Sequence, residues 1–203
     1  GTRFWNYASD EEAVVDALRL ARGMSYKASV AGLNLGGGKS VIIGDNRTPY
    51  REMIFRAHGR AIESLGGRYI TAEDVGTSPD DMEYVLMETD SVVGIYGRSG
   101  DPSPVTAHGV YVGIKAAAMH RYGDDSLDGK HVAVQGVGKV GQFLVDQLVD
   151  EGARVTITDV RYDQIKVVQD RHEGIAVVRP DEILGVECDI LSPCAVGRIL
   201  NDK

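Results

Sequence analysis

The chain has 203 residues, of which 43% are hydrophobic and 26% charged, an ordinary globular composition that argues against disordered and fibrous proteins. The formal net charge of −8 argues against non-specific binding to nucleic acid, so no nucleic-acid partner is expected. No apolar run approaches the roughly 20 residues of a membrane span, and no leader-like segment opens the chain, so we expect a cytoplasmic protein without a membrane partner.

The first half of the chain predicts a mixture of helices and strands without a clean alternation. Ser9 is the expected cap of the first helix, and Glu12, three residues on, completes a capping box. Two short apolar runs between residues 27 and 44 are separated by three glycines, and the second run is rich in β-branched residues. The expected elements are helices over residues 9–23 and 51–65, strands over residues 40–43 and 68–71, and a helix from Thr77 or Ser78 to about Glu88.

The second half alternates more regularly. Residues 97–104 are rich in Gly, Pro and Ser, which indicates a connection, and a long helix then begins at Ser103 or Thr106 and ends near Gly123. The strand–helix–strand spacing that follows predicts a parallel sheet with right-handed crossovers. The expected strands cover residues 131–135, 154–158, 175–178 and 188–192, and the expected helices cover residues 139–151 and 162–172.

These patterns predict an α/β protein of two domains. Residues 1–101 form an N-terminal α/β domain, residues 102–123 a connecting hinge helix, and residues 124–203 a Rossmann-type doubly wound parallel sheet. The chain opens at Gly1 without a Met and stops soon after a predicted strand and short helix, so both ends are interpreted as cuts through a longer protein.

A glycine-rich turn follows the predicted strand over residues 131–135 and opens the next helix. In this context Gly136 permits the tight turn, Gly138 lets the backbone approach a pyrophosphate, and Gly141 lets helix and strand pack closely. The free N–H groups at the helix N-terminus favour phosphate binding. The turn therefore predicts a dinucleotide site, although a glycine-rich turn without a ligand remains open. Its residues are Gly136, Val137, Gly138, Lys139, Val140 and Gly141.

Asp159 follows the next predicted strand and is placed to accept hydrogen bonds from ribose hydroxyls. Its charge would repel a 2′-phosphate, which favours NAD over NADP, while Arg161 could soften that preference. The alternative for Asp159 is a solvated carboxylate at a strand end.

The three glycines before Lys39 invite comparison with a phosphate-binding P-loop. The spacing does not fit, because Leu33 stands where that motif needs a glycine and Gly32 comes one place too early. The lysine should also open a helix, whereas residues 41–43 predict a strand. The P-loop is therefore rejected, and the glycines instead give a small ligand room beside the backbone.

Lys27 lies twelve residues before Lys39, and the two ammonium groups could face one pocket if the two apolar runs pair or fold back. Two cations in a partly buried site lower each other's pKa, so one could act as a general base while the other holds a carboxylate. Asp74 follows the predicted strand over residues 68–71, a position suited to a site carboxylate. From the residues alone, two surface lysines and a turn or capping aspartate remain open as alternatives.

The two cysteines, Cys188 and Cys194, are interpreted as reduced cytosolic thiols. The five histidines lie far apart and show no ligand-like spacing to the cysteines, so no metal site is expected. They also lack the acidic setting of a catalytic histidine, which argues against another NAD enzyme such as a 2-hydroxyacid dehydrogenase.

Several segments together resemble the glutamate/leucine/phenylalanine/valine dehydrogenase family, and most closely its leucine and valine branch. The resemblance runs through essentially the whole chain in order. Gly1-Thr-Arg-Phe and the turn at residues 136–141 lean towards valine dehydrogenases, and Gly32-Leu-Asn-Leu towards leucine dehydrogenases. The segments are residues 20–27, 32–39, 71–77, 102–107, 134–138 and 192–195.

The resemblance implies reversible oxidative deamination of an L-amino acid to a 2-oxo acid and ammonia, with hydride passing to NAD. Lys27 matches the lysine that binds the substrate carboxylate, Lys39 the lysine that activates water, and Asp74 the carboxylate that exchanges protons with the amine. Residues 1–101 would then be the substrate domain, with the active site in a cleft between the domains. Further matches are Gly1 and Met24 in the substrate pocket, and Thr106, Cys194 and Ala195 at the cofactor.

The resemblance also implies that the chain is truncated, since family members are longer on both sides. We expect the full-length protein to be a homo-oligomeric enzyme of branched-chain amino-acid catabolism, and the fragment alone to be weakly active or inactive. The side chains of valine, leucine and isoleucine differ too little in size for the sequence to show which of them is the preferred substrate. A non-catalytic homologue that binds NAD or an amino acid, and the same reaction on an aromatic amino acid, are the alternatives.

Overall fold

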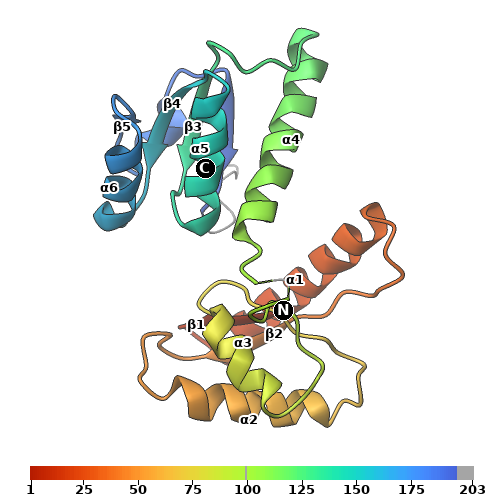
Figure 1. Cartoon of the computed structure of the whole chain (residues 1–203). Coiled ribbons are helices and arrows are strands. Elements are labelled where there is room, and N and C mark those ends of the chain that lie inside the picture. Colours follow the sequence, from red (N-terminus) through yellow and green to blue (C-terminus); the bar gives the residue numbers. More distant parts are fainter. Residues whose placement is uncertain (99, 196–203) are drawn as a thin grey trace. The chain divides into compact units, whose positions relative to one another are not determined.

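A computed structural model of the chain describes residues 1–98 and 100–195 (Figure 1). The chain divides into two compact units, Gly1–Pro102 and Ser103–Lys203. Each unit combines helices with parallel strands, which confirms the predicted α/β fold class. The short helix predicted near the end of the chain falls outside the described residues.

Two parallel strands form the centre of the first unit, β1 (Thr2–Trp5) and β2 (Ser40–Ile43). The segment at residues 72–75 runs along the other edge of β1, because the N–H groups of Thr2 and Phe4 donate to its carbonyls at 2.8 and 3.0 Å. Strand β2 has the predicted bounds, whereas β1 was not predicted. The centre of the unit is therefore the strand that the sequence analysis missed.

The strand predicted over residues 68–71 is wrong. Pairing there is limited to Thr71, which forms a single parallel bridge with Val92. The N–H of Thr71 donates to Ser91 and its carbonyl accepts from Val93, both at 2.9 Å. Asp74 therefore follows one bridging residue rather than a strand.

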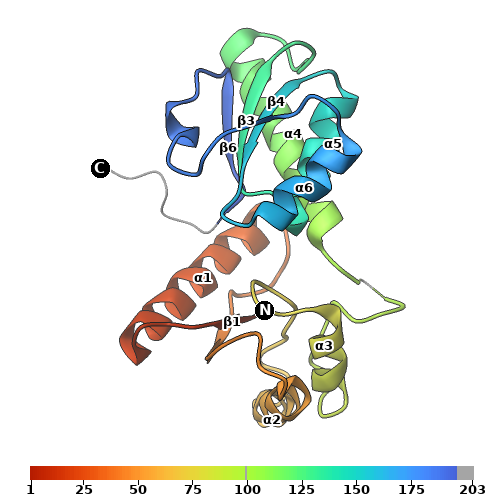
Figure 2. The ribbon, with the colours of Figure 1, turned by 90° about the vertical axis from the view of Figure 1, so that its left-hand side faces the viewer.

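Three helices flank the strands of this unit: α1 (Asp10–Val30), α2 (Arg51–Glu63) and α3 (Pro79–Leu86). Figures 1 and 2 show α1 on one side of β1 and β2, with α2 and α3 on the other. Helix α1 continues well beyond the predicted end at residue 23, since the weak helix propensity of Gly23 is outweighed by its surroundings. Ser9 caps it as predicted, but Glu12 accepts from Ala8 N–H and not from Ser9.

Side chains alternate along β1 and so separate the core from the polar face. Thr2 and Phe4 are buried, and the Phe4 ring meets Phe55 of α2 edge-on with centroids 6.0 Å apart. Arg3 points the other way and pairs with Asp16 of α1. The main apolar cluster of this unit consists of Phe4, Phe55, Ile62, Met82, Val85, Val92 and Ile95.

Ser78, one of the two predicted caps, caps helix α3 with a complete capping box in which Asp81 supplies the carboxylate. Asp81 is only 1% exposed, and it also accepts from Arg51 of α2 through both oxygens, at 2.7 and 2.5 Å. The Arg51 guanidinium lies over the rings of Phe4 and Phe55. This ion pair, in which the carboxylate is buried, ties α2 and α3 to the core of the unit.

The second unit opens with α4 (Ser103–Tyr122) and continues as a four-stranded sheet in the order β5-β4-β3-β6, with every pair parallel. That order is the first half of a Rossmann-type doubly wound sheet, which confirms the fold predicted for this region. Figure 2 shows α5 and α6 along one face of the sheet. The elements are β3 (His131–Gln135), α5 (Lys139–Asp150), β4 (Arg154–Thr158), α6 (Tyr162–Arg171), β5 (Ala176–Val177), a 3-10 turn (Ile183–Gly185) and β6 (Ile190–Pro193).

A single apolar core joins the helices of this unit to the sheet. Val132 and Val134 of β3 and Ile157 of β4 are fully buried, and Leu144 and Leu148 of α5 cover them. Strand β3 is buried along its middle because it lies between β4 and β6. The strand order reverses between β3 and β6, and ligands of such sheets bind at that point, beyond the carboxyl ends of the strands.

Candidate active site

Lys39 and Asp74 form an ion pair in the first unit, with Nζ and Oδ2 3.2 Å apart. Lys39 directly precedes β2, and Asp74 lies in the segment that runs beside β1. Gly1 adjoins the pair, because a β-carbon built on it would lie 3.2 Å from Lys39 Nζ. The structure thus brings together three residues that the sequence analysis singled out separately.

The electrostatic setting of this pair suits proton transfer. The Lys39 side chain is 6% exposed, and burial lowers its pKa below the ordinary 10.5 although Asp74 opposes that shift. For Asp74, burial raises the pKa, but the cations of Lys39 and Arg3 outweigh burial and bring it below 3.8. The carboxylate stays ionised, while the ammonium next to it is easier to deprotonate than a surface lysine.

Arg3 is a third member of this cluster that the sequence analysis did not find. Its Nε donates to Asp74 Oδ2 at 2.9 Å, and its Nη1 donates to Asp16 Oδ2 at 2.9 Å. Tyr7 donates its hydroxyl to the same oxygen of Asp16 at 2.7 Å, and burial raises the Tyr7 pKa. The only signal available in the sequence was the alternation of apolar and polar residues in β1.

Helix α1 carries Met24 and Lys27, and it packs directly on the glycine loop before Lys39. The N–H of Gly37 donates to Ser25 Oγ at 3.0 Å, and a β-carbon on Gly37 would fall 1.9 Å from a carbonyl oxygen of the helix. Lys27 was placed at the start of a short apolar run that could pair with the next run or fold back on it. It lies instead in the last turn of α1, and that helix packs back on the glycine loop. Both Met24 and Lys27 are exposed.

A buried network of hydroxyl groups lies directly behind the ion pair. Thr2 Oγ1 is within 2.8 Å of both Ser40 Oγ and His58 Nε2. Tyr69 donates its hydroxyl to the carbonyl of Gly1 at 2.6 Å and accepts from the Ser40 N–H at 3.1 Å. Burial lowers the pKa of His58, so its imidazole is neutral at neutral pH. This network holds the backbone on both sides of Lys39.

The glycine-rich turn of the second unit lies at the reversal point between β3 and β6. Gly136 has φ +91°, and a β-carbon there would lie 2.8 Å from the amide nitrogen of Ala195. A β-carbon on Gly141 would lie 2.1 Å from the Gly136 carbonyl oxygen and 3.7 Å from Cys194. Only glycine fits at these two positions, and the structure groups Cys194 and Ala195 with them, as expected of one site.

Gly138 of the turn presents its backbone to open space. Gly138 precedes α5 with no side-chain cap, and a β-carbon on it would meet nothing within 4 Å. Lys139 and Val140 form the first turn of that helix. Residues Gly136–Gly141 therefore offer a helix N-terminus beside unfilled space, which suits a pyrophosphate.

Asp159 follows β4 and touches the same turn, since its Oδ2 accepts from the N–H of Val137 at 2.8 Å and its Oδ1 from the N–H of Arg161 at 2.9 Å. The Arg161 side chain is directed to Asp163 at 3.2 Å. Thr106 lies on α4 as an exposed residue next to buried Ala107, and no contact places it with the turn.

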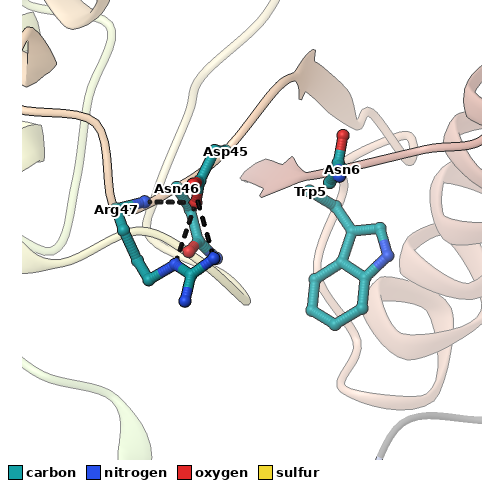
Figure 3. A pocket seen from close by; sticks show the side chains of 5 residues that line it. All are labelled: Trp5, Asn6, Asp45, Asn46 and Arg47. Carbon is teal, nitrogen blue, oxygen red and sulfur yellow. Dashed lines mark hydrogen bonds and ion pairs between the residues drawn. The ribbon is translucent and has the colours of Figure 1, made fainter.

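A surface hollow of about 270 Å³ lies in the first unit, lined by Trp5, Asn6, Asp45, Asn46 and Arg47 (Figure 3). Arg47 is paired with Asp45, whose carboxylate accepts from the Arg47 backbone N–H at 2.9 Å and from the Arg47 Nε at 3.1 Å. The hollow sits after the carboxyl ends of β1 and β2, whereas Gly1 and Lys39 precede their amino ends. It is therefore separate from the candidate active site.

Cys188 and Cys194 are both free thiols, and burial raises the pKa of Cys194. Across residues 1–98 and 100–195, no group of three or more His, Cys, Asp or Glu side chains could hold a metal ion. Within the same part of the chain, no helix is both long and apolar enough to cross a membrane.

Two family models match the chain, one in each half. Residues 1–91 match the Glu/Leu/Phe/Val dehydrogenase dimerisation domain, and residues 110–198 match the NAD binding domain of S-adenosyl-L-homocysteine hydrolase. The second match covers the glycine-rich turn and Asp159. The two units therefore resemble an amino-acid dehydrogenase domain and a dinucleotide-binding domain.

Individual relatives agree with the first match. The chain is 56% identical to a leucine dehydrogenase of Geobacillus stearothermophilus and 51% identical to a valine dehydrogenase of Streptomyces coelicolor, over all of its own length and 56% and 57% of theirs. The crystal structure of L-tryptophan dehydrogenase from Nostoc punctiforme is 42% identical with a TM-score of 0.69, again over the whole chain and 57% of that protein. The chain thus spans little more than half the length of these relatives.

Proposed function

Since this chain belongs to the Glu/Leu/Phe/Val dehydrogenase family, we propose that the protein of which it is part catalyses the NAD-dependent, reversible oxidative deamination of a branched-chain L-amino acid. The products are the 2-oxo acid and ammonia. The observation that carries this proposal is the Lys39–Asp74 pair, 3.2 Å apart and with little exposure of the lysine, in a chain 56% and 51% identical to a leucine and a valine dehydrogenase.

Asp74 and Lys39 divide the proton transfers between them. Asp74, held ionised by two neighbouring cations, accepts a proton from the substrate ammonium and frees the nitrogen lone pair. Loss of hydride from the α-carbon then gives an iminium carbon. Lys39, whose pKa is lowered by burial, takes a proton from the water that adds to this carbon. Asp74 then returns its proton to the nitrogen, and it takes the hydroxyl proton as the carbonyl forms and ammonia leaves. Of the two protons then held by Asp74 and Lys39, one leaves with ammonia as ammonium and one passes to solvent.

The substrate is held at the glycine loop and α1. Lys27 binds the α-carboxylate, a role that suits an exposed ammonium in the last turn of a helix packed on that loop. Gly1 leaves space beside Lys39, and Met24 contributes an apolar, adaptable surface for the substrate side chain. Valine, leucine and isoleucine are the expected substrates.

NAD is the proposed cofactor, and bound NAD would accept the hydride from the substrate α-carbon. The residues present fit it, because Gly138 faces open space at the N-terminus of α5 and Gly136 and Gly141 keep the turn tight. Asp159 would exchange its contact with the Val137 N–H for the ribose hydroxyls and would repel a 2′-phosphate. The other residues proposed to contact the cofactor are Lys139, Val140, Thr106, Cys194 and Ala195.

We further propose that the full-length protein is a cytoplasmic homo-oligomer that works in branched-chain amino-acid catabolism. The description of the matching family model as a dimerisation domain supports the oligomer. The proposed domain boundaries are those predicted from the sequence, with residues 102–123 as a hinge helix.

Deamination of an aromatic amino acid is a second candidate, because the L-tryptophan dehydrogenase of Nostoc punctiforme is 42% identical over the whole chain. Initial rates of NADH formation by the full-length protein, with Val, Leu, Ile, Phe, Trp and Glu and with NAD or NADP, separate the two. The proposal expects the largest kcat/KM with a branched-chain substrate and NAD. A preference for Trp or Phe favours the second candidate, and binding of NAD without turnover of any amino acid contradicts both.

A further inference from the structure

Arg3 lies between two carboxylates, one with a role in the proposed reaction and one without. It comes from the middle of β1, and its side chain is 18% exposed. On one side it meets Asp74, the proposed proton acceptor, and on the other Asp16 of α1, each at 2.9 Å. Asp16 plays no part in the proposed reaction, so its contact with Arg3 has no assigned purpose.

We propose that Arg3 and Asp16 form a positioning pair that fixes the Asp74 carboxylate and sets the balance of charge in the Lys39–Asp74 site. The inference rests on the proposed function, since it assigns Asp74 and Lys39 their roles. Neither Arg3 nor Asp16 contacts the substrate in this proposal. Both act through Asp74 and Lys39, which carry out the proton transfers.

The geometry of the Asp74 carboxylate supports a positioning role. Arg3 Nε and Lys39 Nζ both approach the same oxygen, Oδ2, at 2.9 and 3.2 Å. Two cations on one oxygen fix the rotation of the carboxylate and leave Oδ1 as the face for a substrate amine. Arg3 cannot serve as a proton donor in place of Lys39, because a guanidinium keeps its proton at all working pH values.

The Asp16 carboxylate partly cancels the effect of the Arg3 cation on the pKa of Lys39. The Arg3 cation lowers the pKa of both Lys39 and Asp74, while the Asp16 carboxylate raises that of Lys39. Tyr7 donates its hydroxyl to the Asp16 oxygen that Arg3 also contacts, at 2.7 Å, which keeps Asp16 in place. The five side chains form one chain of contacts from Tyr7 to Lys39.

Other ionisable groups near the pair are accounted for. His58 lies behind β1, hydrogen-bonded to Thr2 and Ser40, and burial keeps it neutral. The amine of Gly1 is near Lys39, but burial, followed by repulsion from Lys39, lowers its pKa to about 5, so it is uncharged at neutral pH as a peptide nitrogen would be. Besides Asp74, the charged side chains that shift the pKa of Lys39 are Arg3, which lowers it, and Asp16, which raises it.

Two substitutions in the full-length protein test the inference, because they must act in opposite directions. Removing the cation in Arg3→Gln should raise the pKa of Lys39 and Asp74, and so move the acid limb of the kcat/KM profile to higher pH. Removing the anion in Asp16→Asn should move that limb to lower pH.

In Arg3→Gln we expect kcat to fall about tenfold or more, with a smaller change in KM, and we expect Arg3→Lys to restore part of kcat. Arg47→Gln, an exposed arginine paired only with its own loop, is the matched control and should leave the profile unchanged.

A second readout does not depend on turnover. The pH dependence of Lys39 acetylation by acetic anhydride, read by peptide mass spectrometry, reports ionisation of its amine directly. The inference expects the midpoint to rise in Arg3→Gln and to fall in Asp16→Asn. Shifts in the same direction in both variants, or no shift in either, would overturn it. If the unaltered protein turns over no amino acid, the proposed function fails, while the acetylation midpoints still decide the positioning pair. If Arg3→Gln does not fold, Asp16→Asn and Arg3→Lys carry the test.

Discussion

The contact between the glycine loop and α1 makes Gly37→Ala the most informative single substitution. A β-carbon on Gly37 would lie 1.9 Å from the Ala21 carbonyl oxygen and 2.4 Å from the Ser25 amide nitrogen. These are backbone atoms of a helix and cannot rotate away. Because a close-packed interface tolerates no such overlap, the loop and the helix must separate by about 1 Å.

The separation breaks the Gly37 N–H to Ser25 Oγ hydrogen bond and moves Lys27 relative to Lys39. A displacement of about 1 Å in a group that positions the substrate can cost about 100-fold in rate. We therefore expect kcat/KM for leucine to fall about 100-fold, mainly through KM, because Lys27 is the proposed carboxylate ligand. Binding of NAD, which is assigned to the other unit, should not change.

The matched control is Gly36→Ala, because a β-carbon on Gly36 meets nothing within 4 Å and its backbone is not left-handed. The assay measures initial rates of NADH formation against amino-acid concentration for both variants of the full-length protein, with NADH affinity by fluorescence. If Gly37→Ala behaves like the unaltered protein, the account of how α1 meets the Lys39 loop is refuted. If Gly36→Ala is as impaired as Gly37→Ala, the cause is a change in the loop itself, in its flexibility or in the room it leaves for the substrate, and not the contact with α1.

Three further predictions concern the cofactor turn, the buried network and the core. Gly141→Ala should unfold at a clearly lower temperature because its β-carbon would lie 2.1 Å from a carbonyl oxygen, whereas Gly138→Ala should keep its stability and lose NADH affinity in fluorescence titrations. His58 has a pKa below its ordinary 6.5 in the folded state, so the unfolded chain takes up its proton first and stability falls as the pH drops below that value. In His58→Gln, denaturant unfolding should therefore lose less stability between pH 7 and pH 5 than in the unaltered protein, and an equal loss would contradict this account. Asp81→Ala removes the bidentate partner of the half-buried Arg51 and the capping box of α3, and should cost about 2–5 kcal/mol in urea unfolding. A cost under about 1 kcal/mol would show that Arg51 finds another partner.

The cofactor turn could be predicted from the sequence because everything that defines it is local. A strand, a glycine-rich turn, a helix and an acidic residue after the next strand follow one another along the chain, and the structure places Gly136, Gly141 and Asp159 together. The parallel sheet around the turn was predictable for the same reason. Errors there are confined to one or two residues at the ends of β5 and β6.

The candidate active site of the first unit could not be assembled in this way. Lys39 and Asp74 are far apart in sequence and meet only because β1 lies between β2 and the segment at residues 72–75. That strand has four residues and was missed, so Arg3, which shares Asp74 with Lys39, was missed with it. The resemblance to a family, and not residue physics, singled out the lysine and the aspartate.

Helix α1 shows a second limit of local reasoning. Gly23 was interpreted as its end, but the helix continues to Val30 and so carries Met24 and Lys27. The contact of Gly37 with Ser25 stabilises this last part of the helix. The sequence near Gly23 gives no sign of that contact. Tertiary packing outweighs the helix propensity of one residue, which is about 1 kcal/mol.

The central claim is that Lys39 activates water in an amino-acid dehydrogenase, and turnover by Lys39→Ala in the full-length protein tests it most directly. NADH formation from leucine, valine and isoleucine should fall by about 100-fold to 10,000-fold, the usual worth of a positioned acid–base group. NADH binding should stay close to that of the unaltered protein, because Lys39 lies outside the dinucleotide turn. Retained turnover in Lys39→Ala would contradict the account.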